Sequence, residues 1–444
     1  MKIIIAKKIY SEEKILNNYG VVIENGVIED ILSEGEIKKK YSNEEIEYWT
    51  DTIMIPGTVN IHNHCFQSLL RGLAVGKPFL EWRDKALYKY SPILTPDDLY
   101  TGAVFAFSEM MKCGVTTVSD FFYVHNDGLE SDEAIIRAAK DVGIRLVLAR
   151  TMYDWDGAPK GYVETIDEAV SNTRLLAQKY NNSSDLMTTV LPAPHSLHAA
   201  SIEMVKKGAD LAKELGTKFH IHVAEEPFEV EDIKNKYGVR PVELLEKIGV
   251  LNSNMVAVHA VWLDENELNL FCKNKVNLAY CPSSNMFLAD GVTNIKKMNS
   301  EKVMIGLGSD GACSNNRISV FEEMRMASIL QKVDKLDALT IDSKDAFNYG
   351  TKNGGLILDL PIGEIKKGMR ADFVGINLND FSMQPMFDND EQMIPNIVYS
   401  MQLTAIKKVV VNGNITVDEG ILKTVSSEYV LDRVKKLMVK FQNC

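Results

Sequence analysis

Eight short apolar segments, each followed by a longer amphipathic one, dominate the middle of this 444-residue chain. The segments read PGTVNI, VTTVSDFF, IRLVLAR, LMTTVLPA, KFHIHV, NMVAVHA, KVNLAYC and KVMIGLGSD. Continuously apolar runs are typical of parallel strands, because both faces of such a sheet are buried. Eight strands alternating with helices predict an α/β fold, a distorted (β/α)₈ or TIM barrel.

The segments between the strands carry helix signals. After the first strand, Thr95 has the character of an N-cap, Pro96 suits the first turn, and Asp98 complements the helix dipole. Gly114 then follows the expected end of that helix. The further helices that we expect cover residues 131–142, 164–180, 201–215, 240–248, 264–273 and 320–332.

The two ends of the chain read differently from its middle. Residues 1–54 and 360–444 hold short strands with turn signals, and the ENGV and VNGN segments contain hairpin-type Asn-Gly pairs. Neither end is large enough for a stable sheet of its own. We therefore expect both ends to pair into one small β-sandwich domain beside a barrel domain of residues 55–359.

Composition excludes several classes of protein. A net charge of −12 argues against nucleic-acid binding, which needs a basic face. We expect no membrane association, because no run approaches the roughly 18 apolar residues of a membrane span. The N-terminal apolar run is too short for a signal peptide. The six cysteines form no C-x-x-C pair, which favours a reducing cytoplasm.

Most of the chemically versatile side chains fall where predicted strands end. His62 and His64 follow the first strand, His222 ends the fifth, His259 ends the sixth and Asp310 ends the eighth. In a TIM barrel the carboxyl ends of the strands form the catalytic face. These five groups are therefore expected in one mouth, although each of them alone has an ordinary structural explanation.

Histidines and a carboxylate in one mouth point to a metal site. Three neutral imidazoles and one carboxylate, with a position left for water, suit Zn²⁺ or Fe²⁺. The fourth strand supplies no lysine that could bridge a second ion, so we expect one divalent metal per chain. On the residues alone, either His220 or His222 could be the ligand from the fifth strand.

Several motifs together resemble the amidohydrolase superfamily. These are IPGTVNIHNH followed by LLRG, HVAEE, VAVHAVWL, CPSSN, GLGSDGACSNN and GEIKKGMRADFVGIN. They are most similar to the branch that holds triazine hydrolases and guanine, 8-oxoguanine and S-adenosylhomocysteine deaminases. The resemblance covers essentially the whole chain, and that branch suggests a homodimer.

The resemblance also implies roles for individual residues. The implied metal ligands are His62, His64, His222 and Asp310, with His222 preferred over His220 because it precedes an acid by three residues. That acid, Glu225, would be the proton shuttle. His259 would orient the attacking water and the developing negative oxygen, and Asp310 would accept the proton of that water.

The implied activity is metal-dependent hydrolytic deamination of an amino-substituted N-heterocycle. Relatives that act on adenosine-type nucleosides tend to carry an acid shortly before the second barrel helix, where this chain has Ser91. We therefore expect a purine-like free base as the substrate. The alternatives are an adenosine-type nucleoside such as S-adenosylhomocysteine or methylthioadenosine, a triazine that loses chloride or an amine, and a non-catalytic binding module.

Four residues are candidates for contacting a small heterocyclic substrate. Gln67 follows the first strand, and His195 ends the fourth. Arg150 ends the third strand, where it could hold a carboxylate or a ring oxygen. Trp82 either stacks as a wall of the site or belongs to the core. We expect two further histidines outside the site, His125 in a surface loop and His198 at the start of a helix.

Overall fold

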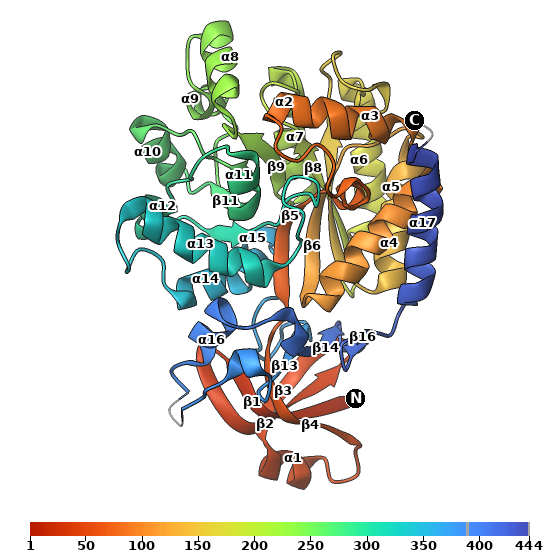
Figure 1. Ribbon diagram of the computed structural model, residues 1–444, viewed down its shortest axis with the longest axis vertical. Helices are drawn as coiled ribbons and strands as arrows, with labels where there is room; N and C mark the ends of the chain where they lie inside the picture. Colours follow the sequence, from red (N-terminus) through yellow and green to blue (C-terminus); the bar gives the residue numbers. More distant parts are fainter. Residues whose placement is uncertain (388–389, 443–444) are drawn as a thin grey trace.

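The barrel strands predicted from the sequence are present in the computed structural model, which describes residues 1–387 and 390–442. They are β5 (Thr58–Asn63), β6 (Val115–Phe122), β7 (Arg145–Met152), β8 (Thr188–Pro194), β9 (Phe219–Val223), β10 (Met255–His259), β11 (Asn277–Tyr280) and β12 (Ile305–Leu307). Neighbouring strands pair in parallel, and helices surround them (Figure 1). The predicted α/β class is confirmed.

The barrel consists of two half-barrels rather than one continuous sheet. Hydrogen-bonded ladders give the strand orders β5-β6-β7-β8 and β12-β11-β10-β9. In the described part of the chain no strand ladder crosses from β8 to β9 or from β12 to β5. Instead, His222 N–H donates to the carbonyl of His195 (2.9 Å), and Asp310 N–H donates to that of His62 (3.0 Å). Both seams are thus joined at the carboxyl ends of the strands.

The barrel helices agree closely with the sequence prediction. They are α4 (Pro96–Lys112), α5 (Leu129–Val142), α6 (Ile166–Tyr180), α7 (Ile202–Leu215), α9 (Pro241–Lys247), α10 (Glu265–Lys273) and α13 (Val320–Lys335). Helix α4 begins with a capping box. The Thr95 hydroxyl accepts from Asp98 N–H (3.3 Å), and the Asp98 carboxylate accepts from Thr95 N–H (2.9 Å).

Other helices lie outside the ranges given above. They are α1 (Glu34–Lys40), α2 (Phe79–Trp82), α3 (Tyr88–Tyr90), α8 (Pro227–Tyr237), α11 (Pro282–Leu288), α12 (Ile295–Ser300), α14 (Ser343–Tyr349), α15 (Lys352–Leu358), α16 (Met393–Tyr399) and α17 (Ser427–Gln442). Helix α17 runs beside α4 (Figure 1), where Arg433 contacts Asp97 (2.7 Å) and Lys440 contacts Asp98 (2.5 Å). Residues 427–442 therefore pack on the barrel.

Strands from both ends of the chain share a sheet below the barrel (Figure 1). Its order is β16-β15-β14-β13-β4-β1-β2-β3. The strands are β1 (Lys2–Ser11), β2 (Lys14–Glu24), β3 (Val27–Ser33), β4 (Ile46–Pro56), β13 (Phe373–Asn377), β14 (Ile406–Val411), β15 (Asn414–Asp418) and β16 (Ile421–Leu422). We propose that these strands form one β domain and that residues 55–359, joined by α17, form the barrel domain.

Two findings bear on the environment that the sequence suggested. No helix in the described ranges is long and apolar enough to cross a membrane. Five cysteines are unpaired, at positions 65, 113, 272, 281 and 313. Cys444, the sixth, lies outside the described residues.

A buried ion pair ties the barrel to the sheet beneath it. The Arg145 guanidinium, at the start of β7, donates through Nε and Nη2 to the two carboxylate oxygens of Asp372 (both 3.1 Å). Its Nη1 donates to the carbonyls of Asp185 and Leu186. Both charged side chains are almost completely buried. Each charge therefore depends on the other for compensation.

Asp372→Ala should lower the free energy of unfolding by about 3–5 kcal/mol, because it leaves a buried guanidinium without its counter-ion. The measurement is the shift in the urea unfolding midpoint followed by circular dichroism. The control is Glu13→Ala, which breaks an exposed pair with Lys344 and should cost less than about 1 kcal/mol. Equal shifts in the two variants would show that the buried Arg145–Asp372 pair contributes no more to stability than the exposed Glu13–Lys344 pair.

Candidate metal and active site

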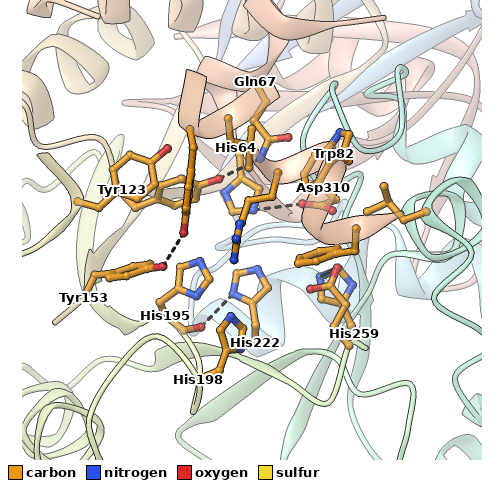
Figure 2. Close-up of a pocket in the computed structure, with 17 residues that line it drawn as sticks. His64, Gln67, Trp82, Tyr123, Tyr153, His195, His198, His222, His259 and Asp310 are labelled. Atoms are coloured by element: carbon orange, nitrogen blue, oxygen red, sulfur yellow. Dashed lines mark hydrogen bonds and ion pairs between the residues drawn. The ribbon is translucent and has the colours of Figure 1, made fainter. Parts of the chain in front are cut away.

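A cavity opens at the carboxyl ends of the barrel strands, and the polar strand-end residues point into it (Figure 2). His64 and Tyr123 come from the first half-barrel, and His222, His259 and Asp310 come from the second. The strands therefore bring together residues that are nearly 250 positions apart in the sequence, as expected for the catalytic face of a TIM barrel.

The predicted metal ligands lie in overlapping groups of neighbouring atoms. The Asp310 Oδ1 atom lies 3.2 Å from His64 Nε2 and 3.4 Å from His62 Nε2. Potential ligand atoms form three overlapping groups, within each of which all atoms lie within 4.8 Å of one another. These groups are His62, His64 and Asp310; His62, His222 and His259; and Glu225, His259 and Asp310.

Hydrogen bonds outside the cavity set the tautomers of two of these histidines. His64 Nδ1 lies 2.6 Å from the carbonyl of Phe121, and His222 Nδ1 lies 3.0 Å from that of His195. A carbonyl only accepts, so each Nδ1 carries the proton and donates it. The Nε2 lone pairs of His64 and His222 are then directed at the cavity, which is the orientation of a metal-binding imidazole.

The carboxylate of Asp310 is oriented in the same manner. Its Oδ2 accepts from the hydroxyls of Ser284 (2.7 Å) and Ser314 (2.8 Å). Its Oδ1 is buried and has no hydrogen-bond partner in the described structure, and neither ring nitrogen of His62 has one. Because His64 donates through Nδ1, its Nε2 and Asp310 Oδ1 are two acceptors only 3.2 Å apart in a buried site, and a positive charge between them would stabilise both. The donor set therefore fits a divalent metal.

Burial favours the neutral form of the His62 and His222 imidazoles, as metal ligation requires. Burial lowers the pKa of His62 to about 3, and nearby imidazoles contribute in the same direction. Burial likewise holds the pKa of His222 well below its usual value of 6.5. A neutral imidazole keeps the lone pair that binds a metal.

Local backbone geometry shapes the metal site. His259 and Asp310 both adopt positive φ values, 67° and 57°, which are uncommon for non-glycine residues. Gly308 and Gly311 allow the chain to pack closely against the end of β5 and the residues that follow it. A Cβ at position 308 would lie 2.7 Å from His62 Cβ, and one at position 311 would lie 1.9 Å from Gln67 Oε1. The GLGSDG segment therefore has the small residues that this packing needs.

Glu225 and His259 face each other beside the candidate metal ligands. Glu225 Oε1 lies 3.3 Å from His259 Nε2, and His259 Nδ1 contacts Asn285 Oδ1 at 2.9 Å. Burial raises the pKa of Glu225 well above its usual value, and the carboxylates of Asp290 and Glu229 raise it further. Glu225 can therefore hold a proton near neutral pH, as a general acid must.

Three of the four predicted substrate contacts line the cavity. Gln67 donates through Nε2 to the hydroxyl of Tyr123 (3.0 Å), which leaves its buried Oε1 without a hydrogen-bond partner among the described residues. Trp82 is buried, and its indole N–H donates to the carbonyl of Cys313 (3.1 Å). The ring of His195 stacks on that of His222 with centroids 4.9 Å apart.

Arg150 does not reach the cavity, contrary to the prediction. Its guanidinium is fully buried and contacts Asp132 (3.0 Å) and Glu164 (2.7 Å). His125 joins this group with Nδ1 at 3.2 Å from Asp132, so it is buried rather than on the surface. A buried charge is costly unless counter-ions compensate it, and these two carboxylates compensate the charge of Arg150.

Sequence reasoning missed several residues around the cavity. Tyr123 and Tyr153 each directly follow a barrel strand, so the strand-end rule that selected the histidines could have identified them. His198 also lines the cavity, ahead of α7. No sequence signal identified Arg83, because the connection between β5 and α4 has no regular apolar period.

His222→Asn should remove the metal, because it replaces a lone pair that is fixed toward the site by the carbonyl of His195. The measurement is metal content per chain by atomic emission, with thermal unfolding alongside. The matched control is His220→Asn, on the same strand, which should keep the metal even if it loses stability. If His220→Asn lost the metal and His222→Asn kept it, His220 rather than His222 would be the ligand.

Comparisons with known proteins agree with this geometry. Residues 53–416 match the model of the amidohydrolase family. A 5-methylthioadenosine/S-adenosylhomocysteine deaminase of Dictyoglomus turgidum is 32% identical over 98% of each chain, and one of Pelotomaculum thermopropionicum is 33% identical over 89% of this chain and 87% of its own.

Solved structures share the fold. A zinc-bound adenosine deaminase from Xanthomonas campestris superposes with a TM-score of 0.91 at 24% identity and covers 100% of this chain and 98% of its own. An atrazine chlorohydrolase from Arthrobacter aurescens, solved with zinc, gives 0.90 at 20% identity over 98% and 100%. The family match over most of the chain shows that this protein is a member of the amidohydrolase family.

Proposed function

We propose that this amidohydrolase, a metal-dependent hydrolytic deaminase, acts on an amino-substituted purine-type ring. The observation that carries the proposal is the buried group of ligand lone pairs directly beside Glu225, a carboxyl group with a raised pKa. Hydrolytic deamination needs an activated water and a proton donor for the ring nitrogen and the leaving amine. Both requirements are met at adjoining positions of this site.

The chain's own residues account for the proton transfers. His62, His64, His222 and Asp310 would hold the metal, which when bound lowers the pKa of a water molecule to near neutrality. Asp310 would take the proton that the attacking water loses, and Glu225 would give its own proton to the ring nitrogen. The proton on Asp310 would then pass through Glu225 to the amino group, which leaves as ammonia when the C–N bond breaks, and the new carbonyl would return its hydroxyl proton to Glu225. His259 Nε2 would face the developing oxygen.

The names of the similar proteins support an adenine nucleoside as the substrate. The sequence favoured a free base, because Ser91 replaces an acid found in nucleoside-specific members. Ser91 is buried and pairs with the Tyr162 hydroxyl (2.6 Å). The relatives named above nevertheless act on 5′-thioadenosines according to their names, and they align over nearly the full chain. This supports an adenosine-type nucleoside as the first candidate.

We further propose zinc as the native metal, a homodimer and a cytoplasmic location. Zinc is supported by two histidines with Nε2 directed at the site and by the zinc in similar structures. The unpaired cysteines favour a reducing compartment. The dimer rests on analogy with the family branch and is tested by light scattering.

Glu225→Gln should retain the metal and lose turnover by about 100-fold or more, because the amide cannot carry the proton to the ring. Ammonia release and metal content are measured on the same preparation.

The control is Glu231→Gln, further along α8, whose side chain is exposed and does not line the cavity, so activity should stay within about three-fold of wild type. Activity of Glu225→Gln close to that of the control would mean that another group moves the proton.

A screen for ammonia release tests the substrate class. The panel contains adenine, guanine, adenosine, 5′-methylthioadenosine, S-adenosylhomocysteine and an aminotriazine. We expect release from the adenosine compounds and none after the metal is removed by a chelator. Release from free bases alone would support the free-base prediction instead. Release from the triazine alone would indicate a triazine hydrolase. Release from none of the compounds would overturn the proposed function.

A further inference from the structure

We propose that Arg83 selects substrates that carry a carboxylate on the group attached to the purine nucleoside. This inference rests on the proposed function and deepens it, because it assigns a residue to the end of the substrate that is remote from the reacting carbon. Arg83 takes the role that the sequence gave to Arg150, whose guanidinium is fully engaged by Asp132 and Glu164.

The cavity presents one strong cation. Among the described residues that line it, Arg83 is the only lysine or arginine. The lining acids are Glu225 and Asp310, and both lie at the metal end. The side chain of Arg83 is 21% exposed, whereas those of Asp310 and His62 are 6% and 0% exposed. The guanidinium therefore lies nearer to solvent than the metal ligands do.

Aromatic rings hold this guanidinium in place. It lies 4.6 Å from the centroid of the Tyr88 ring and 5.8 Å from that of Trp155, and both contacts are of the cation–π type. Arg83 begins the π-helical turn Arg83–Leu87, and such turns are frequent at functional sites. Stacking on rings fixes the plane of the guanidinium before a ligand arrives, which lowers the entropy cost of binding.

Donor capacity remains on Arg83 for a second carboxylate. Its Nε (2.9 Å) and Nη2 (2.8 Å) both approach the same oxygen of Asp84, whose side chain is 56% exposed. A guanidinium has five N–H donors in a fixed fork, so a substrate carboxylate can bind the remaining ones. Arg83 and His198 both line the cavity, and burial, followed by the charge of Arg83, lowers the pKa of His198 to about 4.

Two nucleosides provide an internal comparison for this residue. 5′-Methylthioadenosine and S-adenosylhomocysteine share the adenine ring, the ribose and the thioether. They differ in the group on sulfur, which is a methyl in the first and an amino-acid chain with a carboxylate in the second. With the ring at the metal, only the second presents a carboxylate toward Arg83. Arg83 therefore affects the ratio of their kcat/KM values.

The experiment measures kcat/KM for both nucleosides in wild type, Arg83→Gln and Arg83→Lys. We expect Arg83→Gln to reduce the preference for S-adenosylhomocysteine over 5′-methylthioadenosine by about ten-fold or more, mainly through KM, because a charge-assisted contact remote from the reaction is lost. Arg83→Lys should fall between the two, since it keeps the charge without the fork. The methylthio compound also reports that each variant is folded.

The control is Lys85→Gln, which removes a charge from the same segment outside the cavity and should leave the ratio unchanged. A ratio within about three-fold of wild type in Arg83→Gln, including equal losses on both nucleosides, would overturn the assignment. Wild-type enzyme that deaminates neither nucleoside would instead overturn the proposed nucleoside function, so the two failures are distinguishable.

Discussion

The close approach of buried ligand-type atoms at the carboxyl ends of the strands is the constraint on which this site depends. Asp310 Oδ1 lies 3.4 Å from Nε2 of His62 and 3.2 Å from Nε2 of His64. The surrounding contacts strengthen this arrangement, because Phe121 occupies the other nitrogen of His64 and two serines occupy the other oxygen of Asp310. A bound cation would stabilise this arrangement, which is why these residues are the candidate metal ligands.

The construction of the barrel explains why the site is at this place. Two four-stranded parallel sheets meet along seams whose backbone hydrogen bonds come from His222 and Asp310, which are themselves candidate ligands. A metal held by these residues would also join the half-barrels. Metal binding and barrel closure are therefore expected to be coupled, because a ligand that binds only the folded state stabilises it.

Electrostatics separates the cavity into two ends. At the metal end, burial and neighbouring carboxylates favour a protonated Glu225. Toward solvent, aromatic rings carry the guanidinium of Arg83. Arg150 shows the contrasting case, since two buried acids neutralise it and leave it with a structural role. Arg83 and Arg150 are the same residue type, so the position of each relative to its acidic partners decides which one can contact a substrate.

The sequence by itself determined the barrel strands, the principal helices between them and the strand-end positions of the candidate ligands, because continuous apolar runs and helix caps are local signals. Only the tertiary structure decided the partners of Arg150, the packing of α17 on α4 and the cavity position of Arg83. These depend on contacts between segments far apart in the chain, which no local pattern encodes. Whether a charged side chain is buried and paired is decided only in the folded protein. Two arginines that look equivalent in the sequence can therefore have different roles.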